Sequence, residues 1–275
     1  MGIERNAAAL LLKLRDEGVH FDRTLTLGRQ TPYLEPREYA RALQRAGAPP
    51  VPMPAYADDF FRALGAAQID SVDASSFEGA TLVHDLNLPI PVEWHQQFDV
   101  VFDGGTLEHI FDVRTALRNV MQALKAGGHF VGVSPLNSWC GHGFYQFSPE
   151  LFWRTFSPDN GFSVVGLYAA DGRGACYAVA DPAVVKSRVE LCTASPVSLM
   201  VHARRDAVRD ILLHAPQQSD YASAWNSETT SPQPRSRWKT LPVIRDLLQA
   251  RRHVRYLHQR SFQNRTFYTP VDLRL

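Results

Sequence analysis

The sequence predicts an α/β fold built on a doubly wound, mostly parallel β-sheet with an antiparallel edge strand. Short apolar segments typical of strands alternate with segments of helical periodicity, at intervals of about 20 to 35 residues. Three of the predicted strands lead into an aspartate, at Asp73, Asp85 and Asp103. Two later apolar segments, 163–168 and 197–203, are placed to pair antiparallel at the sheet edge. Together these observations favour βαβ crossovers over an all-helical or all-β chain.

The N-terminal third contains three predicted helices and two predicted strands. The helices cover residues 4–17, 36–46 and 57–64, and the strands cover residues 21–27 and 69–72. In the first helix Ala8, Leu11 and Leu14 recur near helical spacing, and Pro36 suits the first turn of the second. Gly28 ends the first strand. Residues 1–20 are therefore expected to form an N-terminal helix that precedes the main domain.

The central segment alternates between strand and helix. Strands are predicted at 80–84, 98–102 and 129–133, with a helix over 113–124 between the last two. The run FDVVF at 98–102 has the apolar character of a strand that is buried on both faces of a parallel sheet. Gly127-Gly128 stops the helix. This segment predicts the centre of a Rossmann-like sheet.

The C-terminal part adds the antiparallel edge and an extension. A helix over 148–156 is capped by Ser148, and residues 175–180 and 187–192 are expected to form a hairpin inserted at about 171–195. The α/β domain is thus predicted to span 21–205. Residues 206–275 are expected to form a linker followed by a basic helical extension, with helical periodicity over 241–257.

Composition restricts the class of protein. Of 275 residues, 45% are hydrophobic and 21% are charged, and no run approaches the roughly 20 apolar residues that cross a bilayer. The start lacks a secretory signal, so we expect a cytoplasmic protein without a membrane partner. Three widely spaced cysteines predict neither disulfides nor a thiolate zinc site.

Charge is concentrated at the C-terminus. Residues 235–275 contain ten Arg or Lys and two Asp, a net charge of +8, although the whole chain carries +1. Such a tail can dock on its own domain, on a second subunit to form a homodimer, or on an acidic partner. The rest of the chain has no basic patch, so nucleic acid is not an expected partner.

Ligands of a parallel sheet bind beyond the carboxyl ends of its strands, which selects the residues that follow each strand. These are Gly28 and Arg29, Asp73, Asp85 and Leu86, the segment from Asp103 through Gly104 and Glu108 to His109, and the loop 134–145. We expect the functional site among them.

Residues 98–135, FDVVFDGGTLEHIFDVRTALRNVMQALKAGGHFVGVSP, resemble the fourth-strand to fifth-strand segment of class I S-adenosylmethionine-dependent methyltransferases. The shared features are a strand ending in Asp, Thr-Leu-Glu-His, an Asp opening the helix, and Leu-Lys-x-Gly-Gly. The resemblance extends over about 20–205. It implies S-adenosylmethionine as cofactor, with Asp73 at the ribose, Asp85-Leu86 at the adenine, and Asp103, Gly104 and Glu108 in the cofactor pocket.

The first motif departs from the resembled family. There an acid and Gly-x-Gly-x-Gly follow the first strand, whereas residues 26–32 are Thr-Leu-Gly-Arg-Gln-Thr-Pro and retain only Gly28. Those glycines let the backbone approach the methionine part of the cofactor. Arg29 is a candidate to replace them by pairing with a ligand carboxylate. The loop either repairs cofactor binding or serves another ligand.

The loop after the fifth predicted strand contains the candidate catalytic residues. Gly141 and Gly143 flank His142, and aromatic side chains surround it. His142 is predicted to be a general base and Tyr145 a substrate-contacting catalytic group, with the alternative that both support the loop. Glu108 is expected to shape the pocket. Since His84, His109 and His142 lack the spacing of helical metal ligands, no metal site is predicted.

The sequence therefore favours a methyltransferase that acts on an oxygen or nitrogen of a small molecule, as in small-molecule biosynthesis. Two alternatives stay open because of the altered first motif. One is a non-catalytic, methyltransferase-like binding subunit. The other is the same fold with a different reaction, in which the loop Gly28-Arg29-Gln30 grips a different, anionic ligand.

Overall fold

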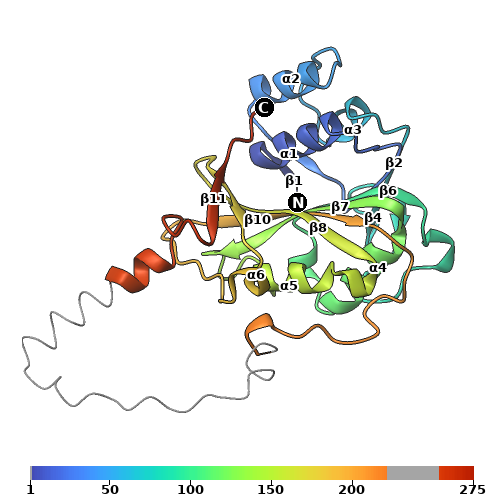
Figure 1. Ribbon diagram of the computed structural model, residues 1–275. Helices are drawn as coiled ribbons and strands as arrows, with labels where there is room; N and C mark the ends of the chain where they lie inside the picture. Colours follow the sequence, from blue (N-terminus) through green and yellow to red (C-terminus); the bar gives the residue numbers. More distant parts are fainter. Residues whose placement is uncertain (1, 222–253) are drawn as a thin grey trace, which may run out of the picture.

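The computed structural model describes residues 2–221 and 254–275. Their strands form a nine-stranded sheet in the order β11-β9-β8-β10-β7-β6-β2-β4-β5 and a two-stranded sheet, β1-β3 (Figure 1). The strands are β1 Gly2–Glu4, β2 Arg23–Leu27, β3 Thr31–Tyr33, β4 Gln68–Asp73, β5 Leu82–Val83, β6 Phe98–Gly104, β7 Leu124–Asn137, β8 Phe162–Asp171, β9 Cys176–Val179, β10 Val197–Arg205 and β11 Tyr268–Val271.

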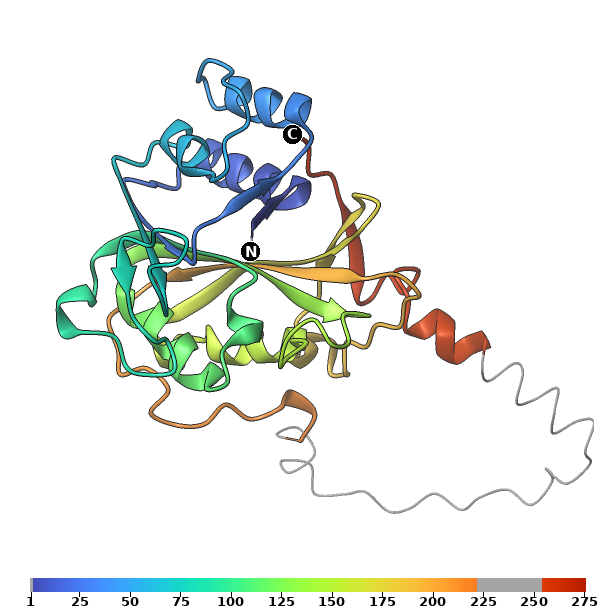
Figure 2. The same cartoon turned by 180° about the vertical axis from the view of Figure 1, so that it is seen from behind.

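Helices cover both faces of the large sheet. They are α1 Arg5–Asp16, α2 Pro36–Arg45, α3 Asp58–Ala63, α4 Val113–Ala123, α5 Pro149–Thr155 and α6 Pro182–Val185. The first three lie on one face and the last three on the other, as the front and back views show (Figures 1 and 2). Each layer encloses its own apolar core. Among the described helices, none combines the length and apolarity needed to cross a membrane.

The parallel half of the sheet is doubly wound, as predicted. Strand β2 pairs in parallel with β4 on one side and with β6 on the other, and β6 pairs in parallel with β7. The chain first builds outward from β2 through β4 to β5, then returns to build β6 and β7 on the opposite side. The topological switch point, where such sheets bind ligands, is therefore between β2 and β6.

The antiparallel part is larger than the single edge strand that the sequence predicted. Strand β10 lies antiparallel between β7 and β8, which confirms the predicted pairing of 163–168 with 197–203. Beyond β8 come β9 and β11. The expected inserted hairpin is corrected: β9 pairs with β8 across a turn at 172–175, and residues 187–192 form no strand. Asp171 sets this turn, because its Oδ1 accepts hydrogen bonds from the backbone N–H groups of Arg173 and Ala175.

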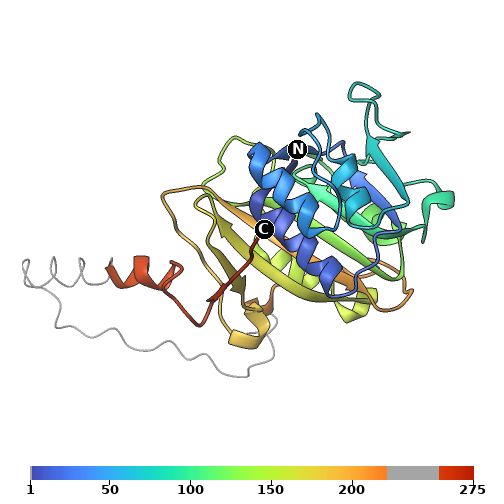
Figure 3. The same cartoon turned by 90° about the horizontal axis from the view of Figure 1, so that it is seen from above.

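The described end of the C-terminal extension returns to its own domain. Most of the predicted helix 241–257 lies outside the described residues, which begin again with a helical stretch at 254–259. Strand β11 then pairs antiparallel with β9. Leu273 and Leu275 pack against the core cluster that contains α1, and the chain ends beside the α1–α2 layer (Figure 3). Of the docking surfaces left open by the sequence, the structure shows the intramolecular one.

The N-terminus is more deeply integrated than an appended helix would be. Residues Ala7 through Leu12 and Leu14 of α1 are all buried, because the sheet covers one side of the helix and α2 covers another. Before it, β1 pairs in parallel with β3. The sequence did not predict this pair, since each strand has only three residues. It is nevertheless important, because it brings the start of the chain to the ligand-binding end of the sheet.

A histidine pair, with His202 buried and His129 half-buried, joins β7 to β10. His129 Nδ1 and His202 Nε2 are 2.8 Å apart, and the two rings are stacked. One ring donates and the other accepts, so the hydrogen bond needs at least one neutral histidine. Burial, followed by the nearby His129, lowers the pKa of His202 to about 3. Burial also lowers the pKa of His129.

We expect this pair to make the fold sensitive to acid. Below pH about 6.5 the unfolded chain binds protons that folded His202 does not, so stability falls as the pH drops toward 3. At pH 5 the loss from His202 alone is about 2 kcal/mol relative to pH 7. Urea unfolding of His202→Phe at both pH values should show a smaller loss than the wild type, with the exposed His214→Gln as control. Equal losses in wild type and His202→Phe would show that the pair does not titrate in this way.

Candidate functional site

A cavity of about 320 Å³ opens at the carboxyl ends of β6 and β7. The switch point is between β2 and β6, whereas the cavity is at the next pair of strands, β6 and β7, toward the antiparallel part of the sheet. Its lining comes from the ends of β6, β7 and β10, the loops that follow β6 and β7, and the small sheet β1-β3. The lining residues are Gly2, Glu4, Tyr33, Gly104, Gly105, Glu108, His109, Val133, Ser134, Pro135, Trp139, His142 and Ser198.

The small sheet β1-β3 forms one wall of the cavity. Gly2, Glu4 and Tyr33 contribute to it. A Cβ atom on Gly2 would lie 2.2 Å from the carbonyl oxygen of Thr31, so only glycine permits the close pairing of the two strands. The sequence does not single out these residues, because nothing in a three-residue strand at the start of a chain indicates what it pairs with.

Glu108 lies at the base of the cavity, in the 3₁₀ turn Leu107–His109 that follows β6. Its side chain is 1% exposed, and its Oε1 is 3.7 Å from Nε2 of His142. The other oxygen, Oε2, is buried without a hydrogen-bond partner. Burial and the nearby Asp103 raise the pKa of Glu108 to about 8. Near neutral pH this carboxyl group is therefore mostly protonated and can exchange a proton with a neighbour.

The loop that follows β7 brings His142 to Glu108. The backbone N–H of Phe144 donates to the Glu108 carbonyl at 2.8 Å, and a Cβ on Gly143 would lie 2.8 Å from that same oxygen. Gly141 adopts φ +84°, which favours glycine. The His142 ring then lies between His109 and Trp139, with ring centroids 5.2 and 5.0 Å away. The two glycines thus allow the loop to dock, and docking places His142 at the cavity.

Tyr145, the second predicted catalytic residue, is outside the cavity lining. Its hydroxyl donates to the carbonyl oxygen of Phe111 at 2.7 Å, and its ring stacks on Phe147. This hydrogen bond fastens the loop to the segment after β6. Tyr145 therefore holds the loop that carries His142 and does not face the cavity.

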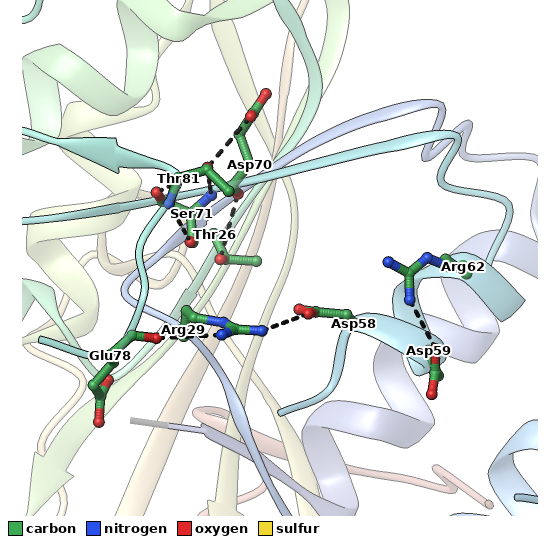
Figure 4. A network of polar contacts seen from close by, with 9 residues as sticks. All are labelled: Thr26, Arg29, Asp58, Asp59, Arg62, Asp70, Ser71, Glu78 and Thr81. Carbon is green, nitrogen blue, oxygen red and sulfur yellow. Dashed lines mark hydrogen bonds and ion pairs between the residues drawn. The ribbon is translucent and has the colours of Figure 1, made fainter. Parts of the chain in front are cut away.

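Arg29, expected to pair with a ligand carboxylate, is used inside the fold. Its Nη2 is 2.7 Å from Oδ2 of Asp58 at the start of α3, and its Nη1 donates to the carbonyl of Glu78 at 3.2 Å (Figure 4). The guanidinium also lies 3.8 Å from the centroid of the Tyr56 ring. The Arg29 guanidinium joins three segments of the protein, because two acceptors and a ring face are within its reach.

Gln30 fills the crevice between β2 and β6. Its side-chain Nε2 donates to the carbonyl oxygens of Leu27 and Gly28, at 2.7 and 3.1 Å. A Cβ on Gly104 would lie 2.0 Å from Gln30 Oε1, so the amide lies directly across that glycine. Gly28 keeps a positive φ of +68°. Gln30 stands in the loop where the resembled family has glycines, and the sequence suggested it only as part of a loop that grips a different, anionic ligand.

The predicted adenosine-binding residues lie beside β4 and β5, away from the cavity. Asp73 ends β4, is half-buried, and accepts one hydrogen bond from the Ser75 N–H at Oδ1. Asp85 is exposed, and hydrogen bonds from the backbone and side chain of Asn87 lower its pKa. Leu86 is buried in the core. The predicted site residues therefore separate into two groups, with Gly104 between them.

Two observations test whether the residues fit S-adenosylmethionine. Asp103 Oδ1 accepts the Thr106 N–H at 2.7 Å, but Oδ2 is buried without a donor, as is Oε1 of Gln30. Burial raises the pKa of Asp103 to about 7. Such buried acceptors suit a cationic donor, and the α-ammonium group of the cofactor is one. The free oxygen of Asp73 suits a ribose hydroxyl, so the residues fit the cofactor when the Gln30 side chain turns away from Gly104.

Comparison with known families agrees with the resemblance found in the sequence. Residues 63–132, from the end of α3 into β7, match the family model of the methyltransferase domain. This segment is therefore similar to that family. It contains Asp73, Asp85, Asp103 and Glu108, and the family implies S-adenosylmethionine as cofactor. A comparison with curated protein sequences found no match.

Solved structures with a similar fold share little sequence with the chain. The branched-chain polyamine synthase from Thermus thermophilus is 16% identical with a TM-score of 0.40, over 80% of this chain and 62% of that one. This chain therefore spans less than two thirds of that protein. The N-methyltransferase NodS from Bradyrhizobium japonicum is 15% identical with a TM-score of 0.42, over 73% of this chain and 86% of that one. Neither likeness carries an argument about substrate.

Proposed function

We propose that the protein is an S-adenosylmethionine-dependent methyltransferase that acts on an oxygen or nitrogen of a small molecule. One observation carries the proposal: the crevice at the switch point and the cavity meet at Gly104. Gln30 covers this glycine from the β2 side, and the same glycine lines the cavity. A cofactor in the crevice and an acceptor in the cavity would therefore be neighbours.

The cofactor, when bound, supplies an electrophilic methyl group. The carboxylate of Asp73 would accept a hydrogen bond from a ribose hydroxyl, and Asp103 Oδ2 would accept one from the ammonium group. Gln30 would give up its two backbone hydrogen bonds in the crevice. Gly28, with its positive φ, would let the loop keep its tight turn.

The cavity limits the acceptor to a small molecule. A volume of about 320 Å³ lies at the lower end of the range for ligand pockets. Ser134, Ser198 and Glu4 offer polar contacts, and Trp139 offers an apolar wall. His142 would take the proton from the acceptor, and its Nε2 lies 3.7 Å from Oε1 of Glu108. Positioning two reactants in adjoining sites supplies a large part of the rate in such transfers.

A second candidate function is supported by the interactions that Arg29 and Gln30, in the loop after β2, make within the protein. Arg29 is paired with Asp58, and Gln30 fills the crevice. A protein that never binds the cofactor would keep both interactions permanently. It would then use the cavity alone, either as a methyltransferase-like binding subunit or for a different reaction. The two candidates differ in whether the cofactor binds.

Calorimetric titration with S-adenosylmethionine and S-adenosylhomocysteine separates them. We expect binding at micromolar strength, weakened about tenfold or more in Asp73→Ala through loss of a hydrogen bond to a charged group. Asp206→Ala is the matched control, because this aspartate follows β10 at the opposite end of the sheet. No heat and no thermal shift with either compound at millimolar concentration would reject the methyltransferase and favour the second candidate.

A further inference from the structure

Three side chains of the cavity form a cluster that the sequence did not predict. One nitrogen each of His109 and His142 and one carboxylate oxygen of Glu108 lie within 4.8 Å of one another. Glu108 and His109 are adjacent in the chain, but His142 is in the loop after the next strand. This spacing matches no local metal-ligand motif, so the expectation of no metal site followed from the sequence. Only docking of the loop makes the cluster.

The donor set is that of a transition-metal site. Two imidazole nitrogens and one carboxylate oxygen bind Zn²⁺ in catalytic sites and Fe²⁺ in facial triads, with positions left open for another ligand. Ligand atoms around a tetrahedral ion with bonds of about 2.1 Å lie roughly 3.4 Å apart. The 3.7 Å between His142 Nε2 and Glu108 Oε1 is close to that value. Small side-chain rotations would therefore complete the site.

A second observation points independently to a cation. Glu108 Oε2 is buried and has no hydrogen-bond donor, and the whole side chain is 1% exposed. A buried carboxyl oxygen without a partner is costly, and a bound ion, which displaces the carboxyl proton, would remove that cost. Among the residues that the structure describes, no Lys or Arg side chain lines the cavity and could neutralise this oxygen.

The cluster is also held in place and open on one side. Gly105 and Gly143 both pack closely on Glu108, where a Cβ would lie 3.1 Å from Oε1 and 2.8 Å from the backbone oxygen respectively. All three candidate ligands line the cavity. An ion bound to them would therefore present its remaining coordination positions to a small molecule in the cavity.

We propose that Glu108, His109 and His142 bind a divalent transition-metal ion of the Zn²⁺ class. Binding of the ion does not depend on methyl transfer. The role of the ion in catalysis does rest on the proposed function. The ion would bind an oxygen of the acceptor and favour its deprotonated form, as metal ions do for bound water. In that state His142 is a ligand of the ion, and the proton of the acceptor passes to solvent through the open side of the cavity.

Metal analysis of the full chain without an affinity tag tests the site. After equilibrium dialysis against micromolar Zn²⁺ we expect about one ion per chain in the wild type, and below about 0.2 in His142→Ala and Glu108→Gln. His142 is the safer variant, because its side chain is 44% exposed and its loss should leave the fold intact, as checked by circular dichroism. Substitution with Co²⁺ should give visible absorption bands that His142→Ala lacks.

Two controls separate this site from surface binding. His84→Ala removes a histidine outside the cluster, and Cys140→Ser removes the exposed thiol in the same loop. Both should retain about one ion per chain. The proposal is overturned if the wild type binds no stoichiometric Zn²⁺, or if Cys140→Ser loses the ion while His142→Ala keeps it. Neither result would affect the cofactor titration, which is measured without metal and depends on Asp73.

Discussion

Substitution of Asp103 by asparagine is expected to weaken binding of S-adenosylhomocysteine by about 30-fold or more at pH 8, a loss of about 2 kcal/mol. The side chain is fully buried and its Oδ2 has no donor, so a cationic group of a ligand gains a strong hydrogen bond there. Asparagine keeps the shape but removes the charge. Because the substitution is nearly isosteric, the fold should be preserved.

The same substitution should change how binding depends on pH. Burial raises the pKa of Asp103 to about 7, so the free protein carries the proton at pH 6 and loses it by pH 8. Only the ionised form attracts a cation, and affinity should therefore rise with pH through 7 and then level off. Titrations at pH 6, 7 and 8 should show this rise in the wild type and in Asp206→Asn, and a flat profile in Asp103→Asn. A flat wild-type profile would mean that Asp103 does not contact the ligand.

Gln30→Ala, unlike Asp103→Asn, is not expected to weaken binding of S-adenosylhomocysteine. The amide lies across Gly104 and makes two backbone hydrogen bonds that a ligand in the crevice must break. Without this side chain the crevice is open in the free protein. The affinity of the variant should therefore equal or exceed that of the wild type, which distinguishes an obstructing side chain from a ligand-holding one.

Replacement of Arg205 by leucine is expected to lower the free energy of unfolding by about 3 kcal/mol. Arg205 ends β10 and is 3% exposed. Its Nη1 donates to the carbonyl oxygens of Met121 and Leu124, at 3.1 and 2.6 Å, where α4 ends. The last carbonyls of a helix have no partner inside the helix, and a buried one left unpaired is costly.

The neighbouring Arg204 is the matched control. Its side chain is 53% exposed and pairs with Asp206 at 2.7 Å, an interaction worth at most about 1 kcal/mol. Urea unfolding should therefore separate Arg205→Leu from Arg204→Leu by about 2 kcal/mol. Similar losses for the two variants would show that capping of α4 by Arg205 contributes little to stability.

The parallel half of the fold was predictable from the sequence because each of its elements has its own local pattern. The run at 98–102 is apolar except for Asp99, and the structure buries it as β6 in the interior of the sheet, between β7 and β2. The helix predicted at 113–124 is α4, with its apolar stripe in the core. The antiparallel part was predicted less well. Strand β9 has only four residues, and β11 follows a segment of different composition, so neither pattern reveals its partner.

The candidate site was only partly predictable for the same reason. His142 was recognised because glycines flank it in a loop at the ligand end of the sheet, and Glu108 because of its motif. The wall formed by Gly2, Glu4 and Tyr33 was missed, and Gln30 was expected to grip a ligand and not to fill the crevice. Their positions depend on how the segment after β2 folds back and on the pairing of β1 with β3. The hydrophobic periodicity of the sequence predicts neither contact.

The sequence by itself determined the order of strands and helices in the parallel half, the strand ends that carry acidic residues, and the altered loop at Gly28. Tertiary structure alone decided that Arg29 pairs with Asp58, and that Gln30 closes the crevice over Gly104. It also brought His142 to Glu108 and His109. The physical reason is the range of the interactions. Hydrophobic periodicity acts within one element, whereas a site at the end of a parallel sheet is assembled from loops that are distant in the chain and meet only when the strands pair.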